Sequence, residues 1–430
     1  MRITVDNRVG HFDVSGQIIL QGSKNSMLNN LCLPILTNEE CIIDNVPDIS
    51  DIRLNIDCLK ALNAKIKWIN KNKVSIQCDE IINKPMEPQI SSKTTGSKFF
   101  IPLMVQRFGE YYTGASGGCD IGDRVFEYYA KSLEPFGITF QIKDNVYRFY
   151  KTKSKSSNFT LPFPSFGLTV NAILSCVLNE EESVLANVCM EPEIDNTIEM
   201  LNSMAIKVLR YKSEIRIIGN KKPTGCSFRN MSDRNAAVTF SIMALITNSM
   251  LEIHNFDNFK MEAFYSFLDV INAQYKTDIN KLTILKHYNK LNPISVKAFL
   301  YPNFHSDWQP LIAPLLTQIE GKSSIEELLF PNRLKYWLEL EKMGAKYNYN
   351  YNTETRFKDT NPHYVETFGI QKLNGTEVVA TDLRGGMSLI IASLVAQGKT
   401  IINNAEEINR GYENIIETLN LLNVKILKNG

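Results

Sequence analysis

Hydrophobic positions along the chain fall in six similar runs, each of which predicts the end of an amphipathic helix, a turn and the start of a strand. The runs begin at Leu59, Leu133, Leu201, Leu268, Leu340 and Leu419. Asn or Gly occupies the helix-ending position in five of them, and both residues adopt a left-handed backbone at low cost; Ala205 is the exception. Ahead of most runs an apolar helix leads through a polar turn into a short strand, as in residues 171–188 and 239–256. The pattern predicts one structural unit repeated six times.

Each predicted repeat consists of a helix, a strand, a second helix and two further strands, over about seventy residues. The first helix is apolar on nearly all sides, which indicates burial, whereas the second has a charged face that should meet solvent. Six repeats divide most simply into two similar α/β domains of three repeats each. Pro and Gly in residues 221–229 mark the boundary, and a cleft between two such domains is the expected place for a ligand.

Composition narrows the class of protein. The chain has 430 residues, which predicts two or three domains, and its 44% hydrophobic and 22% charged residues are typical of globular proteins. A net charge of +1 argues against nucleic acid or an acidic membrane as the main partner. We expect a cytoplasmic protein, because the start of the chain has no secretory signal and no apolar segment reaches the ~18 residues of a membrane span. The eight cysteines show no CxxC pair and no zinc-type spacing, so we expect reduced thiols and no metal.

The sharpest local motif is the glycine-rich segment 114–124, GASGGCDIGDR. Its glycines allow the backbone to approach a ligand, and Cys119 and Arg124 lie just ahead of a predicted helix. The positive end of that helix and Arg124 would both favour a thiolate at Cys119 or an anion beside it. The alternative is that Cys119 is a small buried hydrophobic residue, as most free cysteines are.

Two other loops place candidate residues at the start of predicted buried helices. Lys24 and Asn25, in GSKN, bring a cation and an amide to a place where phosphate could bind, although a solvated lysine beside a helix cap would give the same pattern. Asp307, in NFHSDWQP, could accept a proton from a hydroxyl group or could be an ordinary helix cap.

Further cations occupy similar places. Asp382 and Arg384 lie in ATDLRGGMS, and Arg410 lies in NRGYENI, in each case ahead of a predicted helix. With Lys24 and Arg124, the two arginines give four cations that the fold could gather on one cleft. Several cations that face one point require an anion, so we expect a small, multiply charged substrate.

The order of the motifs resembles that of one enzyme family. GSKN, NVPDISDI, RFGE, GGCDIGDR, EPEI, SDR, FPNR, ATDLR and NRGYE follow one another as in the MurA family of enolpyruvyl transferases, in the EPSP synthase superfamily. The resemblance runs from Val5 to Ile426 and implies an α/β fold of two inverted, barrel-like domains, each of three βαβαββ units. Residues 23–229 would form one domain and residues 1–22 plus 230–430 the other, with the active site in the cleft between them.

The resemblance also implies a reaction. Members of this family transfer the enolpyruvyl group of phosphoenolpyruvate to a hydroxyl of UDP-N-acetylglucosamine for peptidoglycan synthesis, through a tetrahedral intermediate that loses phosphate. No cofactor or metal is implied, because phosphoenolpyruvate is a co-substrate. The implied catalytic residues are Cys119, which matches the lid cysteine that fosfomycin alkylates, Asp307, which matches the base, and Lys24. The implied substrate-binding residues are Asn25, Arg124, Glu127, Ser165, Gly167, Arg333, Asp382, Arg384 and Arg410.

The chain departs from the family on the acceptor side. Thr95 replaces an arginine, with Lys93 and Lys98 as the nearest cations, and Ala236 replaces a glutamate. Phe163 replaces a lysine that contacts the acceptor's diphosphate, a loss worth ~1–3 kcal/mol if the charge was partly buried. Three functions stay open: the enzyme that uses UDP-N-acetylglucosamine, a relative in specialised metabolism that uses a nucleoside monophosphate such as UMP, and a non-catalytic binding paralogue.

Overall fold

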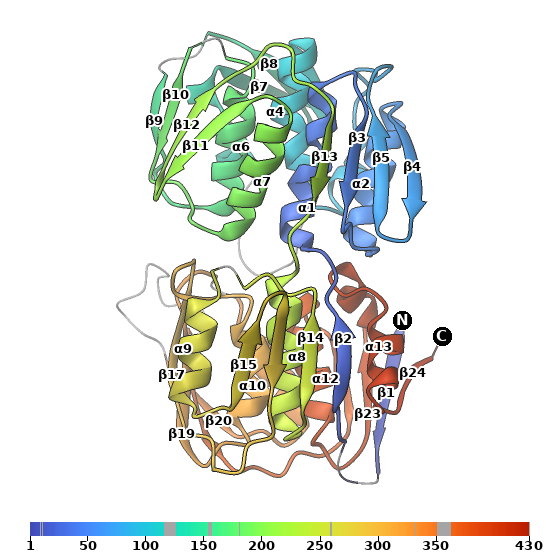
Figure 1. Ribbon diagram of the computed structural model, residues 1–430, viewed down its shortest axis with the longest axis vertical. Coiled ribbons are helices and arrows are strands. Elements are labelled where there is room, and N and C mark those ends of the chain that lie inside the picture. Colours follow the sequence, from blue (N-terminus) through green and yellow to red (C-terminus); the bar gives the residue numbers. More distant parts are fainter. Residues whose placement is uncertain are drawn as a thin grey trace. The chain divides into compact units, whose positions relative to one another are not determined.

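The computed structural model describes all residues except 9, 11, 116–125, 154–156, 180, 259, 331, 351–362 and 430. The described residues fold into two compact units, each with its own hydrophobic core (Figure 1). We call residues 22–231 the central unit and residues 1–21 with 232–429 the terminal unit. The chain therefore passes into the central unit once and leaves it once.

The strands of the described residues form six sheets, three in each unit. In each sheet, the strand that follows the first helix of a repeat pairs antiparallel with another strand. In five sheets this partner is the last strand of the same repeat, and in the sixth it is a strand from the start of the chain. In five sheets the strand that follows the first helix also pairs with a parallel strand on its other side. The expected α/β class and the sixfold repeat are thereby confirmed.

The central unit contains three repeats. The first consists of α1 (Lys24–Asn30), η1 (Leu33–Leu36), β3 (Cys41–Asp44), α2 (Ser50–Ala61), β4 (Lys65–Asn70) and β5 (Lys73–Gln77), and it is completed by β13 (Cys226–Arg229). The second consists of α3 (Pro88–Ser91), α4 (Ser97–Phe108), β6 (Glu110–Thr113), α5 (Phe126–Lys131), η2 (Glu134–Phe136), β7 (Ile138–Lys143) and β8 (Val146–Lys151). The third consists of β9 (Asn158–Thr160), α6 (Phe166–Cys176), β10 (Ser183–Ala186), α7 (Pro192–Ser203), β11 (Lys207–Tyr211) and β12 (Glu214–Ile218).

The terminal unit contains the other three repeats. The fourth consists of β2 (Gly16–Ile19), α8 (Arg234–Ile246), β14 (Leu251–His254), α9 (Glu262–Val270), β15 (Tyr275–Asp278) and β16 (Lys281–Ile284). The fifth consists of β17 (Ser295–Phe299), β18 (Phe304–His305), α10 (Gln309–Leu316), β19 (Gly321–Glu327), α11 (Tyr336–Lys342), β20 (Tyr347–Asn350) and β21 (Tyr364–Gly369). The sixth consists of β22 (Glu377–Val379), α12 (Leu383–Ser393), β23 (Gly398–Asn403), η3 (Ala405–Arg410), α13 (Ile415–Leu421), β24 (Ile426–Asn429) and, from the other end of the chain, β1 (Arg2–Asn7).

The helix-ending turns have the conformation that the sequence predicts. All six predicted positions have φ between 61° and 99°, namely Asn63, Gly137, Ala205, Asn272, Gly344 and Asn423. A left-handed backbone costs a residue with a Cβ atom roughly 1–2 kcal/mol, and Asn and Gly reduce that cost. Ala205, with φ 61°, adopts it as well, so the repeat geometry overrides the local preference there.

A second turn recurs that the sequence pattern did not reveal. Asn45, Asn187, Asn255 and Asn404 each have φ between 55° and 58° at the end of a central strand. Each side-chain amide donates to the carbonyl just beyond the neighbouring parallel strand, over 2.7–3.0 Å. This asparagine joins the carboxyl ends of two parallel strands, and in each case the next helix of the repeat follows.

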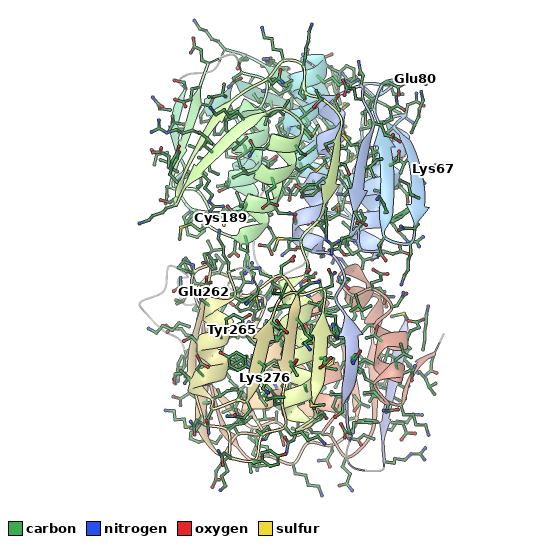
Figure 2. All side chains as sticks on the ribbon, in the orientation of Figure 1. Lys67, Glu80, Cys189, Glu262, Tyr265 and Lys276 are labelled. Atoms are coloured by element: carbon green, nitrogen blue, oxygen red, sulfur yellow. The ribbon has the colours of Figure 1, made fainter. Side chains whose placement is uncertain are left out.

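Burial follows the predicted pattern. Every residue of α8, α10 and α12 is buried, as expected for first helices that are apolar on all sides. Charged side chains such as Lys67 and Glu80 lie on the outside of the central unit (Figure 2). Within the described part of the chain, no helix has the length and apolar character needed to cross a membrane.

Candidate active site

A cluster of buried charges lies in the terminal unit, where α10 and α12 begin. One carboxylate oxygen of Asp307 accepts a hydrogen bond from Nη2 of Arg333 over 2.6 Å. The other lies 3.6 Å from Nε of Arg384. The two arginines are only 3% and 2% exposed, whereas the side chain of Asp307 is 19% exposed. The structure thus brings together three of the predicted site residues that lie far apart in sequence.

Asp307 is not a helix cap. The N-cap residue of α10 is Trp308, and no side chain caps this helix. The carboxylate of Asp307 instead receives a long hydrogen bond of 3.4 Å from the amide of Asn235, which in turn accepts one of 2.9 Å from the Trp308 indole. Asn235 is a site residue that the sequence analysis missed, although it directly follows the SDR motif at residues 232–234.

Of the charges in the cluster, that of Arg384 costs the most free energy to bury. None of its side-chain nitrogens has a hydrogen-bond partner among the described residues. Its guanidinium carbon lies 5.2 Å from the centre of the Tyr412 ring, and Tyr412 is fixed by a hydrogen bond of 2.7 Å to Thr239. Burial lowers the pKa of Arg384, but Tyr412 and the carboxylate of Asp307 outweigh that effect and raise it. The Arg384 guanidinium is therefore a permanent cation in a buried position, where an anion would be strongly attracted.

Asp382 positions this cation. Its carboxylate caps α12 by accepting hydrogen bonds from the backbone N–H groups of Arg384 and Gly385, over 2.8 and 3.2 Å. The short link fixes the first turn of the helix that carries the Arg384 side chain. The structure thus gives Asp382, which we predicted to bind substrate, a capping role.

Glu327 holds the loops that carry the cluster, and the sequence analysis did not predict it. It is fully buried, and it accepts hydrogen bonds from the Ser306 hydroxyl over 2.7 Å and from the backbone N–H groups of Leu329 and Phe330 over 2.8 and 3.0 Å. Burial raises its pKa from 4.5 to about 7. The side chain ties Ser306, the neighbour of Asp307, to the loop that leads to Arg333.

Arg410 lies at the end of η3 and makes an ion pair of 2.8 Å with Glu407. Its side chain is 16% exposed, which makes it more accessible than Arg333 and Arg384.

In the central unit, Lys24 is the first residue of α1, as predicted, and it is not a solvated surface lysine. It is 6% exposed and its Nζ lies 2.8 Å from a carboxylate oxygen of Asp51 in α2. Ser23 caps the helix, and Asn25 is partly exposed in its first turn. Because Lys24 is already paired, an incoming anion would have to share it with Asp51.

Ser165 and Gly167 lie at the start of α6, where Ser165 is the N-cap. A Cβ atom at Gly167 would lie 2.7 Å from Nζ of Lys98, so this glycine admits the Lys98 ammonium group to the helix start. Phe163, two residues ahead of the cap, accepts a hydrogen bond from the backbone N–H of Ser165. Of the two lysines considered near Thr95, Lys98 is therefore the one that brings a cation to this turn.

The remaining predicted residues contribute less to the described geometry. Glu127 is exposed in the first turn of α5. Cys119 and Arg124 lie outside the described residues. Among the described residues no group of three or more His, Cys, Asp or Glu side chains could hold a metal ion.

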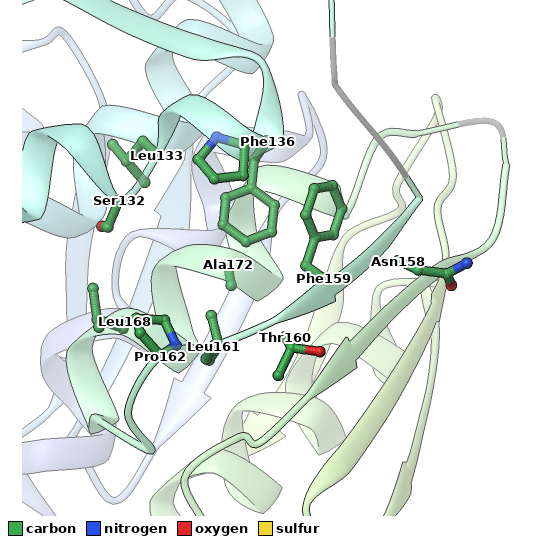
Figure 3. Close-up of a pocket in the computed structure, with 11 residues that line it drawn as sticks. Ser132, Leu133, Phe136, Asn158, Phe159, Thr160, Leu161, Pro162, Leu168 and Ala172 are labelled. Carbon is green, nitrogen blue, oxygen red and sulfur yellow. The ribbon is translucent and has the colours of Figure 1, made fainter.

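The central unit also has an apolar pocket of about 400 Å³ beside α6 (Figure 3). Leu133, Phe136, Phe159, Leu161 and Leu168 line much of it, and none of its lining residues in the described part of the chain is charged. A phosphate-bearing substrate needs cations or backbone N–H donors, so this pocket does not fit the charged ligand that the motifs predict.

Comparison with known proteins places the chain in the class of enolpyruvyl, or 1-carboxyvinyl, transferases, as the motifs indicated. A family model for EPSP synthase (3-phosphoshikimate 1-carboxyvinyltransferase) matches residues 10–419, and the chain therefore belongs to this family. A UDP-N-acetylglucosamine 1-carboxyvinyltransferase of Wolbachia sp. subsp. Brugia malayi is 32% identical over 412 residues, which are 94% of each chain. UDP-N-acetylglucosamine 1-carboxyvinyltransferase 2 of Clostridium tetani is 30% identical over 421 residues, or 97% of this chain and 98% of the relative.

Solved structures show the same fold. The enolpyruvyl transferase NikO from Streptomyces tendae aligns with a TM-score of 0.87 and 18% identity over 99% of this chain and 98% of its own. EPSP synthase from Acinetobacter baumannii aligns with a TM-score of 0.73 and 16% identity over 99% of both chains. At these identities the likeness establishes the fold, whereas the substrate has to be inferred from the residues of the site.

Proposed function

We propose that this enzyme transfers the enolpyruvyl group of phosphoenolpyruvate to a hydroxyl of UDP-N-acetylglucosamine and releases inorganic phosphate. The names of the two relatives support this acceptor. The observation that carries the proposal is the cluster in which Arg333 and Arg384 are buried beside Asp307. Phosphoenolpyruvate carries a carboxylate and a phosphate, and either would supply the hydrogen-bond acceptors that Arg384 lacks among the described residues.

In the proposed reaction, the acceptor oxygen bonds to C2 of phosphoenolpyruvate while C3 gains a proton, which gives a tetrahedral intermediate. C3 then loses a proton and the C2–O bond to phosphate breaks, which restores the enol double bond in the product. Asp307 takes the hydroxyl proton, and Arg333 and Asn235 orient its carboxylate. Arg384 stabilises the anionic phosphoenolpyruvate and the charge on the departing phosphate.

The central unit contributes to the proposal through four side chains. Lys24, held by Asp51, and the sequence-assigned Arg124 bind the phosphate of phosphoenolpyruvate, and Cys119 transfers the proton at C3. Lys98 at the start of α6 supplies a cation for the phosphates of the nucleotide acceptor. We propose that residues 23–229 and residues 1–22 plus 230–430 form two domains that serve this one reaction. No cofactor is required, because phosphoenolpyruvate supplies both the transferred group and the leaving group.

The proposed setting is the cytoplasm, where the enzyme would act on small molecules in peptidoglycan synthesis. The near balance of 47 basic and 46 acidic residues supports small-molecule substrates over nucleic acid.

A second candidate acceptor is a nucleoside monophosphate such as UMP. Phe163 favours it, because the chain places an aromatic ring where the family has a cation for the second phosphate. The TM-score of 0.87 to NikO is compatible with this candidate but, at 18% identity, does not choose between the two acceptors.

The test is release of inorganic phosphate from phosphoenolpyruvate in the presence of UDP-N-acetylglucosamine, with the product identified by mass. We expect one phosphate per enolpyruvyl adduct. Phosphate release with UMP alone would replace the first acceptor by the second. Labelling of Cys119 by fosfomycin without turnover on either nucleotide would indicate a different acceptor, and the absence of both labelling and turnover would indicate the non-catalytic paralogue.

A further inference from the structure

The cysteines are distributed unevenly. All eight lie between residues 32 and 226, and the seven in the described part of the chain are free thiols of the central unit. Six of these seven are buried, and Cys226 is partly exposed. The proposed reaction uses none of the seven, so their arrangement needs a separate explanation.

Two of the thiols face each other across neighbouring strands. β3 and β13 are parallel, and Cys41 is the register partner of Cys226. Figure 1 shows the two strands side by side. Neighbouring strands lie about 4.8 Å apart and partnered side chains project from the same face. This spacing falls within the roughly 4.4–6.8 Å between Cα atoms that a disulfide bond requires.

The same face of the sheet points into the core. Ile43 and Phe228, the partnered residues two positions further along these strands, are both buried. Cys41 is fully buried on the inner strand β3, whereas β13 is the edge strand of its sheet, which leaves Cys226 accessible. A reagent from solvent would therefore reach Cys226 first.

The two thiols differ in reactivity because they interact. A hydrogen bond between them lowers the pKa of Cys226, and a second hydrogen bond from Ser203 acts in the same direction. The same interaction, together with burial, raises the pKa of Cys41. Since the thiolate is the nucleophile, Cys226 is the attacking group and Cys41 the resolving group.

We propose that Cys41 and Cys226 form a reversible redox-modification site that a peroxide converts into a disulfide between the first and last strands of the central unit. The Cys226 thiolate attacks one oxygen of hydrogen peroxide, the O–O bond breaks, and sulfenic acid and hydroxide form. The Cys41 sulfur then attacks the sulfenic sulfur, the S–S bond forms, and water leaves with the thiol proton. The two thiols lose two electrons, peroxide gains them, and a dithiol reductant reverses the bond by exchange.

The cross-link would fix a segment next to Lys24, the candidate site residue at the start of α1. β13 continues into Asn230, whose amide donates to the carbonyls of Ser23 and Asn45 over 3.0 and 3.2 Å. Lys24 follows Ser23 directly. A disulfide at Cys41 and Cys226 would close nearly the whole central unit into one loop, and it should raise Tm by roughly 5 °C or more.

The experiment exposes the full-length native protein to hydrogen peroxide, blocks the remaining thiols with N-ethylmaleimide and maps the peptides without reduction. We expect a peptide pair joined through Cys41 and Cys226, two hydrogen atoms lighter than the sum of its parts, which dithiothreitol separates. The cross-link and the rise in Tm should disappear in Cys226→Ser. They should persist in the matched variant Cys189→Ser, which removes a buried thiol of the same unit that lies on neither strand (Figure 2).

Two results would overturn the proposal, and neither requires a variant to fold. In the first, native wild-type protein accumulates sulfinic acid at Cys226 while Cys41 is recovered unlinked. In the second, the cross-link forms only after denaturant is added. Because the readout is specific to these two peptides, oxidation of Cys119 in the same sample does not affect the answer.

Discussion

Arg333 and Arg384 of the terminal unit are buried beside Asp307, whereas the central unit pairs its buried Lys24 with Asp51 and brings Lys98 to the start of α6. Both units contain three sheets built on the same antiparallel core pairing, and both use the same left-handed turns. The scaffold is therefore common, and the chemistry lies in the residues placed where its first helices begin.

The two units differ in how far their buried cations are already paired with protein groups. Lys24 has a carboxylate at 2.8 Å, so a phosphate that binds it shares a charge that is already paired. Arg384 has its nearest carboxylate oxygen at 3.6 Å and no hydrogen-bond partner among the described residues. The terminal unit is thus the one that an anionic substrate would stabilise most, and the predictions below test this assignment from the largest expected effect to the smallest.

Asp307→Asn should lower kcat by roughly 10²–10⁴-fold, because the amide cannot take up the hydroxyl proton. Steady-state phosphate release measures the effect, and binding of phosphoenolpyruvate should persist because both arginines remain. The matched control is Asp278→Asn, at an exposed position of β15 in the same unit, which should leave kcat unchanged. A decrease of less than tenfold in Asp307→Asn would remove the base from the mechanism.

Glu327 should make stability depend on pH. Its pKa is about 7 in the folded protein against an ordinary 4.5, so the folded state holds an additional proton between these values. The free energy of unfolding should therefore fall by about 3 kcal/mol as pH rises from 4.5 to 7. Glu327→Gln keeps the acceptor for the two backbone N–H groups and should remove this part of the slope in denaturant titrations. An identical slope in both proteins would contradict the burial of a titrating Glu327.

Arg384→Met should separate activity from stability. We expect KM for phosphoenolpyruvate to rise about 10- to 100-fold, since a charge-assisted contact is lost. The free energy of unfolding without substrates should stay level or rise, because an apolar side chain replaces a buried cation that lacks hydrogen bonds. Steady-state phosphate release measures KM, and urea titrations without substrates measure the free energy of unfolding. A loss of several kcal/mol in stability would show that Arg384 is structural.

Lys98→Met should raise KM for a nucleotide acceptor about fivefold, as expected for one partly exposed charge contact, and leave KM for phosphoenolpyruvate unchanged. Lys67→Met, at an exposed position of β4 in the same unit, is the matched control. Phe163→Lys should have the opposite effect and lower KM for an acceptor with two phosphates. If Lys98→Met changes both KM values equally, the lysine does not distinguish the substrates.

Ala205→Gly should stabilise the protein by roughly 0.5–1 kcal/mol, because glycine adopts the φ of 61° without steric cost. Ala61→Gly, at the exposed end of α2, should not stabilise it. Chemical denaturation of both variants measures the difference. Destabilisation of Ala205→Gly would mean that the alanine methyl group makes contacts worth more than the backbone strain.

The repeats could be predicted because their signals are local. The left-handed turn at Asn63 and the all-apolar face of α8 depend on residues a few positions apart, and six occurrences reinforce each other. The bridging role of Asn45 escaped prediction because its partner, the carbonyl of Asn230, lies just beyond β13, the last strand of the unit.

The site was predicted in its parts but not in its assembly. Charge and helix starts pointed to Asp307 and Arg384, but their pairing with Arg333 depends on tertiary contacts. Glu327 escaped because a glutamate in a strand has no distinguishing neighbours in sequence. The approach of Lys98 to Gly167 joins two helices almost seventy positions apart and offers no local signal.

The most direct test of the account is a competition between UDP-N-acetylglucosamine and UMP at equal concentration, with phosphoenolpyruvate as donor and the products resolved by mass. We predict an enolpyruvyl adduct on UDP-N-acetylglucosamine, formed with one equivalent of inorganic phosphate. An adduct on UMP alone would contradict the proposed acceptor and show that Phe163 marks a changed specificity. The formation of neither adduct would contradict the assignment of the Asp307 cluster to enolpyruvyl transfer to these nucleotides.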